Sequence, residues 1–467
     1  MRVILKYLGY LLLISAVLRL IPLIVALIYG ESIKLHLISF TITLVVGIVC
    51  SLVQPEKDEF TITKAFILTA LCFLVSSLIG SIAFLPLFKW NFHNAFFESV
   101  SGFTTTGLSM ISDLSIVPKS VLFWRAQTQW IGGIGIVVVF LFLISVMTSR
   151  KSLKDTKMHV QSIGRLYHAT ASVNSPDGTP REVIKSTLWI YLFYTFLGIG
   201  FLYITGLPLF EAITICFAAL STGGFSVTNV FYTNAWQLLV ISIIMILGAT
   251  SFVFHHKVFR LKLKNIFQKS QMKLFSYILI LFFVISMFFS DKYKEIIFEL
   301  ISALTTAGFS ITDTNLLPQV VVLLVVLGMF IGGSTGSTAG GFKLYRVGLL
   351  LKSIAWKLKK LTSPPNAVIP LKIQGEAVEI EELTLAGIFF FMYILFALMG
   401  ILIFMFLGYD FFHSVYQIIS SLCTVGLSSM SLIGVPLIGK YTMIVMMFLG
   451  RLEVFPIVII VYKLFSR

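Results

Sequence analysis

The sequence predicts an all-α polytopic membrane protein with ten transmembrane helices. Three observations predict it: the apolar composition, the spacing of long apolar runs, and a short motif that recurs four times. Of the 467 residues, 58% are hydrophobic and 12% are charged, whereas a soluble domain carries about 25% charged residues. Such a composition is typical of a chain whose helices face lipid.

Ten apolar runs are long enough to cross a hydrocarbon layer of ~30 Å. They lie at 7–29, 36–53, 65–88, 118–148, 187–205, 235–254, 272–290, 317–350, 382–408 and 439–464. The first run exceeds the ~7–15 residues of a signal-peptide core, so we expect a retained span. After a leading pair, the runs form four pairs, and each pair encloses a shorter apolar segment.

The four shorter segments are too short to span a membrane and too apolar for ordinary loops. They lie at 91–104, 208–221, 293–305 and 410–423. This length fits re-entrant half-helices. Irregular backbone at membrane depth is tolerated only where it is buried in protein or lines water. We therefore expect the four segments to face a common interior, where the partial negative charge of their C-termini favours a cation.

The pattern Thr-x-Gly-[Leu/Phe]-Ser follows each half-helix. Glycine accepts backbone angles that other residues avoid, and threonine adds a hydroxyl oxygen. A ring of backbone carbonyls is how a protein replaces the hydration shell of potassium. A single copy is compatible with a plain helix-ending turn, but four equivalent copies favour a selectivity filter. The predicted potassium-binding residues are Thr105, Thr106, Gly107, Thr222, Gly223, Gly224, Thr306, Ala307, Gly308, Thr424, Val425 and Gly426.

With these motifs, residues from about 60 to 467 resemble the TrkH/TrkG/KtrB/HKT superfamily of potassium transporters. The two leading spans make the chain most similar to the TrkH members. The resemblance implies four pseudo-repeated helix–pore loop–helix units around a central pore, plus two N-terminal helices. In the HKT branch a Ser at the place of Gly107 goes with sodium selectivity, so Gly107 favours potassium. The expected units are 1–55 for the leading helices, then 60–150, 183–258, 271–350 and 382–467 for pore repeats one to four.

A glycine-rich run interrupts the span at 317–350. Five glycines in ten residues do not hold a continuous helix. They are Gly332, Gly333, Gly336, Gly340 and Gly341. One interpretation is close packing of small residues between helices. The other, which the resemblance implies, is an intramembrane gating loop below the filter.

Arg451 and Glu453 lie inside the last predicted span. An ionisable group in hydrocarbon is costly and usually faces a cavity or a partner. A structural ion pair is one interpretation. The resemblance implies that Arg451 points into the pore below the filter, as an electrostatic barrier to cation flow.

Three polar side chains are placed to brace the filter from behind. Glu98 and Glu299 each precede their motif threonine by seven residues, and Gln417 has the matching place in the fourth repeat. The segment 129–135, Gln-Trp-Ile-Gly-Gly-Ile-Gly, is interpreted as a site of close helix packing.

Positive residues set the expected orientation. They gather in the connections 150–185, 257–273 and 343–372, each after the second span of a repeat. The positive-inside rule makes that side cytoplasmic, and ten spans then put both termini in the cytoplasm. The formal net charge of +15 is thereby attributed to topology, not to nucleic-acid binding. The expected location is the cell (inner) membrane, as a multi-pass protein in the lipid bilayer.

The predicted function is potassium uptake, with potassium ions as substrate, no organic cofactor and no enzymatic activity. The resemblance implies a homodimer and a separate cytoplasmic nucleotide-binding regulatory subunit of the TrkA/KtrA type. A sodium or mixed monovalent-cation transporter of the same fold, with or without proton or sodium coupling, stays open. An alternating-access carrier would show inverted repeats. An integral-membrane enzyme would need clustered catalytic His, Asp or Glu within its spans.

Overall fold

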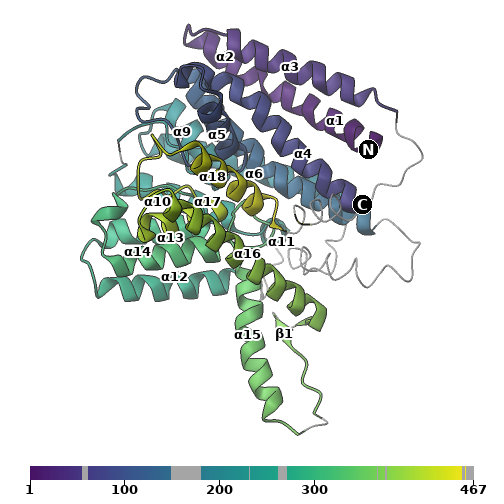
Figure 1. Ribbon diagram of the computed structural model, residues 1–467, viewed down its shortest axis with the longest axis vertical. Helices are drawn as coiled ribbons and strands as arrows, with labels where there is room; N and C mark the ends of the chain where they lie inside the picture. Colours follow the sequence, from purple (N-terminus) through teal and green to yellow (C-terminus); the bar gives the residue numbers. More distant parts are fainter. Residues whose placement is uncertain are drawn as a thin grey trace.

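The computed structural model describes residues 1–54, 62–148, 180–230, 232–260, 271–364, 367–373, 376–454 and 458, and within these ranges it is mostly helical (Figure 1). The N-terminal helices are α1 (Arg2–Leu18), α2 (Leu20–Ile28), α3 (Lys34–Ser51), α4 (Ile62–Gly80) and the 3₁₀ helix η1 (Ser81–Phe88). Next come α5 (Phe92–Phe103), α6 (Lys119–Thr148), α8 (Pro180–Ile204), α9 (Leu209–Leu220), α10 (Ala235–Ala249) and α11 (Phe252–Phe259). The remaining elements are α12 (Met272–Met287), α13 (Tyr293–Thr305), η2 (Thr314–Leu316), α14 (Gln319–Ile331), α15 (Leu344–Leu361), β1 (Lys372–Ile373), β2 (Glu376–Ala377), α16 (Ile380–Phe406), α17 (Phe411–Leu422) and α18 (Leu437–Arg451).

Five helices of the described chain, or six with one bent pair, are long and apolar enough to cross a membrane. The five lie at Arg2–Ile28, Lys34–Ser51, Thr63–Phe88, Ile184–Ile204 and Ile380–Phe406. The count of ten spans stays a prediction, because several predicted runs are not single helices. Most of the basic connections 150–185 and 257–273 lie outside the described residues.

Two predicted spans, 235–254 and 317–350, divide at a sharp bend or at a non-helical segment. The run 235–254 divides into α10 and α11, which are bent by 102°. The run 317–350 divides into α14, a non-helical segment at 332–343, and α15. We call residues 332–343 the Gly-rich loop.

Backbone hydrogen bonds from the Gly-rich loop satisfy the polar groups at the bend between α10 and α11. The carbonyls of Gly248 and Ala249, at the end of α10, accept from the N–H groups of Thr338 (3.1 Å) and Ser334 (3.0 Å). The N–H of Phe252, at the start of α11, donates to Gly336 O at 2.9 Å. Buried helix ends need such partners, so the Gly-rich loop is what allows the α10–α11 break.

The four predicted half-helices are confirmed within about one residue as α5, α9, α13 and α17. Each packs against a helix from a distant part of the chain: α5 on α18, α9 on α6, α13 on α10 and α17 on α14. Each half-helix also packs on the next long helix of the chain, α6, α10, α14 or α18, so that these contacts together close a cycle. The half-helices therefore surround one centre, and their C-terminal ends position the candidate site.

Of the leading helices, α1 and α3 pack against α4, and α3 also packs against η1 (Figure 1). Arg19, at the break between α1 and α2, donates to Ser39 Oγ at 2.5 Å and lies 4.6 Å from the Trp124 ring centroid. The Glu31 carboxylate accepts from the N–H groups of Lys119 (2.6 Å) and Ser120 (2.8 Å) at the start of α6. These contacts attach the leading helices to α6.

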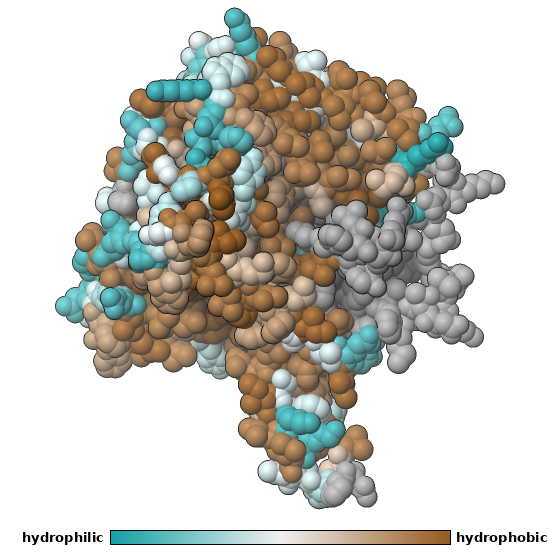
Figure 2. Space-filling view, in the orientation of Figure 1, coloured by the Kyte–Doolittle hydropathy of each residue, from teal (hydrophilic) through white to brown (hydrophobic). Residues whose placement is uncertain are grey.

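The outer surface is largely hydrophobic. Figure 2 shows a continuous brown area over the N-terminal helices, and side chains such as Ile24, Leu27 and Val45 are exposed there. A surface of this kind is stable against lipid tails and not against water. Below the main body, α15 and the small antiparallel pair β1–β2 project away (Figure 1).

Candidate functional site

The backbone has the same unusual conformation at all four Thr-x-Gly segments. We call residues 105–107, 222–224, 306–308 and 424–426 the tip motifs. Their threonines have positive φ, at 53° for Thr105, 54° for Thr222, 54° for Thr306 and 50° for Thr424. Positive φ is a genuine outlier for a β-branched residue. Residues held in such regions cost about 1–3 kcal/mol each and cluster at functional sites.

A common hydrogen bond holds each strained threonine. The N–H of the middle residue donates to the carbonyl five residues earlier, inside the half-helix. The pairs are Thr106 to Ser101 (2.8 Å), Gly223 to Ala218 (2.8 Å), Ala307 to Ser302 (2.9 Å) and Val425 to Ser420 (2.9 Å). This is a common way for a helix to end, with glycine usual at the left-handed position. Here threonine occupies that position four times.

The third residue of each tip motif is a glycine that contacts the next tip motif. All four have positive φ, between 75° and 97°. A Cβ atom on each would overlap a carbonyl oxygen: Gly223 O for Gly107, Ala307 O for Gly224, Val425 O for Gly308 and Thr106 O for Gly426. The contacts follow chain order and return to the first motif. The twelve predicted residues therefore come together in one closed ring, with the middle carbonyls at its contacts.

The threonine hydroxyls of the ring differ in their partners. Among the described residues, Thr105 Oγ1 and Thr424 Oγ1 are buried without a hydrogen-bond partner. Thr306 Oγ1 accepts from the N–H of Gly340 at 2.7 Å, and Thr222 Oγ1 donates to Ser221 O at 2.7 Å. A buried hydroxyl without a partner is costly, and an unpaired oxygen of this kind is suited to a cation.

Three of the four tips are braced by a side chain of their own half-helix. The Glu98 carboxylate accepts from Ser109 Oγ (2.9 Å), and Glu299 accepts from Ser310 Oγ (2.6 Å). Gln417 Oε1 accepts from Ser428 Oγ (3.1 Å). These contacts confirm the expectation from spacing. The equivalent place in the second half-helix is Ile215, which is buried and apolar, so the second tip has no brace of this type.

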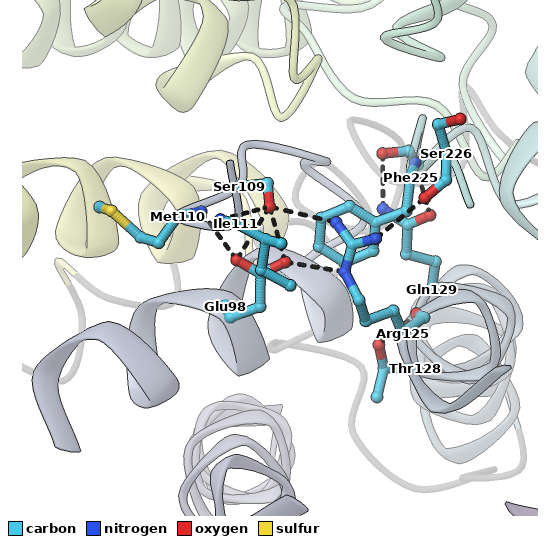
Figure 3. A network of polar contacts seen from close by, with 10 residues as sticks. Glu98, Ser109, Met110, Ile111, Arg125, Thr128, Gln129, Phe225 and Ser226 are labelled. Carbon is cyan, nitrogen blue, oxygen red and sulfur yellow. Dashed lines mark hydrogen bonds and ion pairs between the residues drawn. The ribbon is translucent and has the colours of Figure 1, made fainter. Parts of the chain in front are cut away.

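Side chains of α6 reach across to the second tip (Figure 3). The Arg125 guanidinium donates to Glu98 Oε1 (2.8 Å), to Ser109 Oγ (3.1 Å) and to Ser226 O (2.9 Å). It also lies 4.1 Å from the Phe225 ring centroid. Arg125 and Glu98 are 2% and 0% exposed, so this charge pair is shielded from solvent and joins the first tip to the second.

Gln129, one turn further along α6, contacts the second tip directly. Its Nε2 donates to Gly223 O at 2.6 Å, and its Oε1 accepts from the N–H of Phe225 at 3.1 Å. Sequence reasoning attributed the segment 129–135 to close helix packing. That holds for Gly132 and Gly133, which lie against Phe103 O and Ser221, and not for Gly135, which has open space. The missed signal is a set of polar residues, 125 and 127–129, inside an apolar run.

The Gly-rich loop is buried and lies against the ring. Thr338 Oγ1 donates to Gly248 O (2.9 Å) and lies 3.0 Å from Leu220 O, while the N–H of Gly341 donates to Cys423 O (3.0 Å). The five predicted glycines all lie in this loop. Gly332 (φ 71°) and Gly341 (φ 76°) pack on each other, and Gly336 also has a positive φ, at 70°. Gly333 lies against Ala339. A Cβ on Gly340 would overlap Cys423 O.

Arg451 joins the Gly-rich loop to α6. Its Nη1 donates to Thr338 O at 2.7 Å and its Nη2 to Gly132 O at 2.7 Å, and the residue is 4% exposed. Glu453 is paired with Arg346 rather than with Arg451. The Arg346 guanidinium also lies 4.1 Å from the Phe389 ring centroid. The interpretation as a structural ion pair is therefore confirmed for Glu453, with Arg346 as its partner, whereas the Arg451 guanidinium donates to two backbone carbonyls.

Among the residues that the structure describes, no group of three or more His, Cys, Asp or Glu side chains could hold a metal ion. The oxygens gathered at the tip motifs are carbonyls and hydroxyls. Such neutral oxygens are the ligands with which proteins coordinate potassium.

Comparison with known proteins gives concordant matches. Residues 34–290 and 284–466 match the TrkH family, described as cation transport protein. An uncharacterized cation transporter of Methanocaldococcus jannaschii is 31% identical, over 99% of this chain and 96% of its own. The Trk system potassium uptake protein TrkH of Vibrio parahaemolyticus is 29% identical, over 100% and 99%. The crystal structure of the potassium transporter TrkH from that organism superposes with a TM-score of 0.86, at 27% identity, over 100% of this chain and 99% of its own.

Proposed function

Because the chain belongs to the TrkH family of cation transport proteins, which are transporters and not enzymes, we propose that it takes up potassium ions across the cell membrane. The ion path runs through the ring of four tip motifs, which acts as the selectivity filter. The observation that carries this proposal is the closure of that ring. Each filter glycine abuts a carbonyl oxygen of the next motif, and the fourth returns to the first.

The chemistry of the ring suits a monovalent cation. Carbonyl and hydroxyl oxygens carry no net charge, so they can replace a hydration shell without holding the ion too tightly to leave. The unpaired hydroxyls of Thr105 and Thr424 supply further oxygens. The C-terminal ends of four half-helices add partial negative charge beside the ring. The strained threonines hold these oxygens in place before an ion arrives.

We further propose that the Gly-rich loop, with Gly332, Gly333, Gly336, Gly340 and Gly341, gates the path. It contacts the ring through Gly340 and Thr338, which lie beside the second, third and fourth tips. Arg451 contributes a positive charge on the same side, as a barrier to cation flow. Its hydrogen bonds to Thr338 and Gly132 hold the loop across the path.

The remaining architecture belongs to the same proposal. The chain forms two leading helices (1–55) and four pore repeats (60–150, 183–258, 271–350 and 382–467), with four-fold pseudosymmetry about the pore. Both termini face the cytoplasm. The functional assembly is a homodimer in the inner membrane, controlled by a cytoplasmic nucleotide-binding subunit of the TrkA/KtrA type. The name Trk system potassium uptake protein, borne by the Vibrio relative, supports a multi-component system.

Growth on limiting potassium tests the function. Expression of the chain in a bacterium that lacks potassium uptake should restore growth, and the Gly107→Ser and Gly426→Ser variants should restore it less. Failure of the unmodified chain to rescue, at confirmed expression in the membrane, would contradict the proposal.

The alternative is a sodium or mixed-cation transporter of the same fold, and relative fluxes decide it. Purified protein in liposomes should carry potassium in preference to sodium. Equal or greater sodium flux would favour the alternative, which the description of the Methanocaldococcus relative as a cation transporter leaves open.

A further inference from the structure

We propose that Gln129 is a positioning residue for the second tip of the filter, and that it takes the place of the brace which the second half-helix lacks. This inference rests on the proposed function, because it assigns a role in ion selectivity. Gln129 lies on α6, 94 residues before its partner Gly223 in the sequence. It is completely buried, with an exposed fraction of 0%.

The second tip differs from the other three in two ways. Its half-helix carries Ile215 where the others carry Glu98, Glu299 or Gln417. It also contains two consecutive glycines, Gly223 and Gly224. Glycine has the widest choice of backbone conformations. The second tip is therefore the most flexible of the four by sequence and the only one of these tips without a brace from its own half-helix.

The amide of Gln129 compensates for both differences. It donates to the carbonyl before Gly224 and accepts from the N–H after it, at 2.6 Å and 3.1 Å. A side-chain amide carries both a donor and an acceptor group, so it can bond the carbonyl of Gly223 and the N–H of Phe225 at the same time. The two bonds restrain the peptide planes on either side of Gly224. The Gly223 carbonyl, which packs against Gly107, is thus kept in the ring.

Gly223 itself is explained by this contact. The middle residues of the other tips, Thr106, Ala307 and Val425, carry side chains. A Cβ on Gly223 would overlap the amide of Gln129. The side chain from α6 occupies the space that the other tips fill with their own side chains. Gln129 and Gly223 are therefore matched, and each requires the other.

Arg125 supports the same tip from one turn away. Its guanidinium stacks on Phe225 and donates to Ser226 O. Figure 3 shows Arg125 and Gln129 pointing from α6 to Phe225 and Ser226. Its bonds to Glu98 and Ser109 also serve the first tip, so Arg125 variants would disturb two tips. Gln129 is the sharper test because its two bonds both go to the second tip.

The experiment measures the potassium-to-sodium flux ratio of purified protein in liposomes, for Gln129→Leu and the control Gln127→Leu. Gln127 is on the same helix and 1% exposed, but its Nε2 donates to Leu18 O of the leading helices at 2.8 Å. Gln129→Leu should lower the ratio about fivefold or more, since a buried carbonyl loses its donor. Gln127→Leu should lower thermal stability and leave the ratio within about twofold of the unmodified protein. An unchanged ratio for folded Gln129→Leu would overturn the inference.

A compensating pair keeps the inference testable if Gln129→Leu does not fold. Gly223→Ala should lower uptake and the flux ratio, because its methyl group would push the buried Gln129 amide away from both of its hydrogen-bond partners. Adding Gln129→Ala should restore flux with a reduced flux ratio, since Ala307 shows that the ring accepts a methyl at the middle position. A double variant no better than Gly223→Ala would overturn the inference.

Transport by the unmodified protein distinguishes a failure of the proposed function from a failure of the role proposed for Gln129. If it carries no potassium, the proposed function fails. If it carries potassium selectively and Gln129→Leu is equally selective, only the role of Gln129 fails.

Discussion

The tip motifs and the Gly-rich loop are both buried, glycine-containing segments without helical structure, but the tips form a repeated ring and the loop does not. The tips repeat one backbone geometry four times, with the same strained threonine, the same helix-ending bond and the same glycine contact, and nearby side chains brace it. The loop has no second copy among the described residues. It is held largely by bonds to other segments, including those of Thr338 and Arg451.

This difference indicates how one protein can combine a rigid ring with a movable segment. A ring in which each glycine abuts a carbonyl of the next tip cannot shift at one tip without disturbing its neighbours. The loop can move only by exchanging its bonds one by one, both the side-chain bonds of Thr338 and Arg451 and the backbone bonds to α10 and α11, and each contributes about 0.5–1.5 kcal/mol net. Four variants test this comparison, from the largest expected effect to the smallest.

The largest effect is expected at the ring. Gly426→Ala should abolish potassium uptake, because a Cβ would overlap Thr106 O and open the ring at its closing contact. The measurement is potassium flux in liposomes. Gly434→Ala is the matched control, since Gly434 also has positive φ, at 88°, but no atom lies within 4 Å of its Cβ position. Similar losses in both variants would show that backbone strain, and not ring contact, is responsible.

Arg451→Ala should raise cation flux about tenfold, since it removes a unit charge from a low-dielectric path and frees the Gly-rich loop. Flux into liposomes at fixed potassium gradient measures it. Arg451→Lys retains the charge but not both hydrogen bonds to Thr338 and Gly132. It therefore distinguishes the role of the charge as a barrier from the role of the hydrogen bonds in holding the loop. Flux of Arg451→Ala that stays level or falls would refute both roles.

Thr338→Val should raise flux by a smaller factor, about two- to fivefold, because the hydroxyl contacts to Leu220 O and Gly248 O are lost while the shape is kept. Its control is Ser337→Ala, whose hydroxyl donates within the loop to Ser334 O at 2.6 Å. Equal flux from both variants would argue against Thr338 as a contact that holds the loop closed.

The smallest effect on transport is expected far from both segments. Glu31→Gln weakens the cap on α6 and should lower stability by about 0.5–2 kcal/mol. Flux per folded molecule should not change. Thermal unfolding in detergent and flux at matched protein content give the two quantities. A changed flux per folded molecule would mean that α6 transmits strain to the ring through Gln129.

Local features of this chain followed from its sequence. The sequence predicts the half-helices to within about one residue, because a short apolar segment with a helix-ending turn is encoded within a dozen neighbouring positions. The braces from Glu98, Glu299 and Gln417 followed from equal spacing to their motifs, since spacing along a helix determines which side chain reaches the turn. The resemblance to the TrkH superfamily was likewise correct.

Tertiary structure alone decided which distant residues meet. The α10–α11 break follows no proline in the sequence and exists because the Gly-rich loop supplies its hydrogen bonds. Arg451 meets Gly132 across 319 positions rather than its neighbour Glu453, and Gln129 meets Gly223 across 94. No local propensity encodes such pairs. They depend on how buried polar groups find partners once the helices have packed, because an unpaired polar group in the interior is too costly to leave.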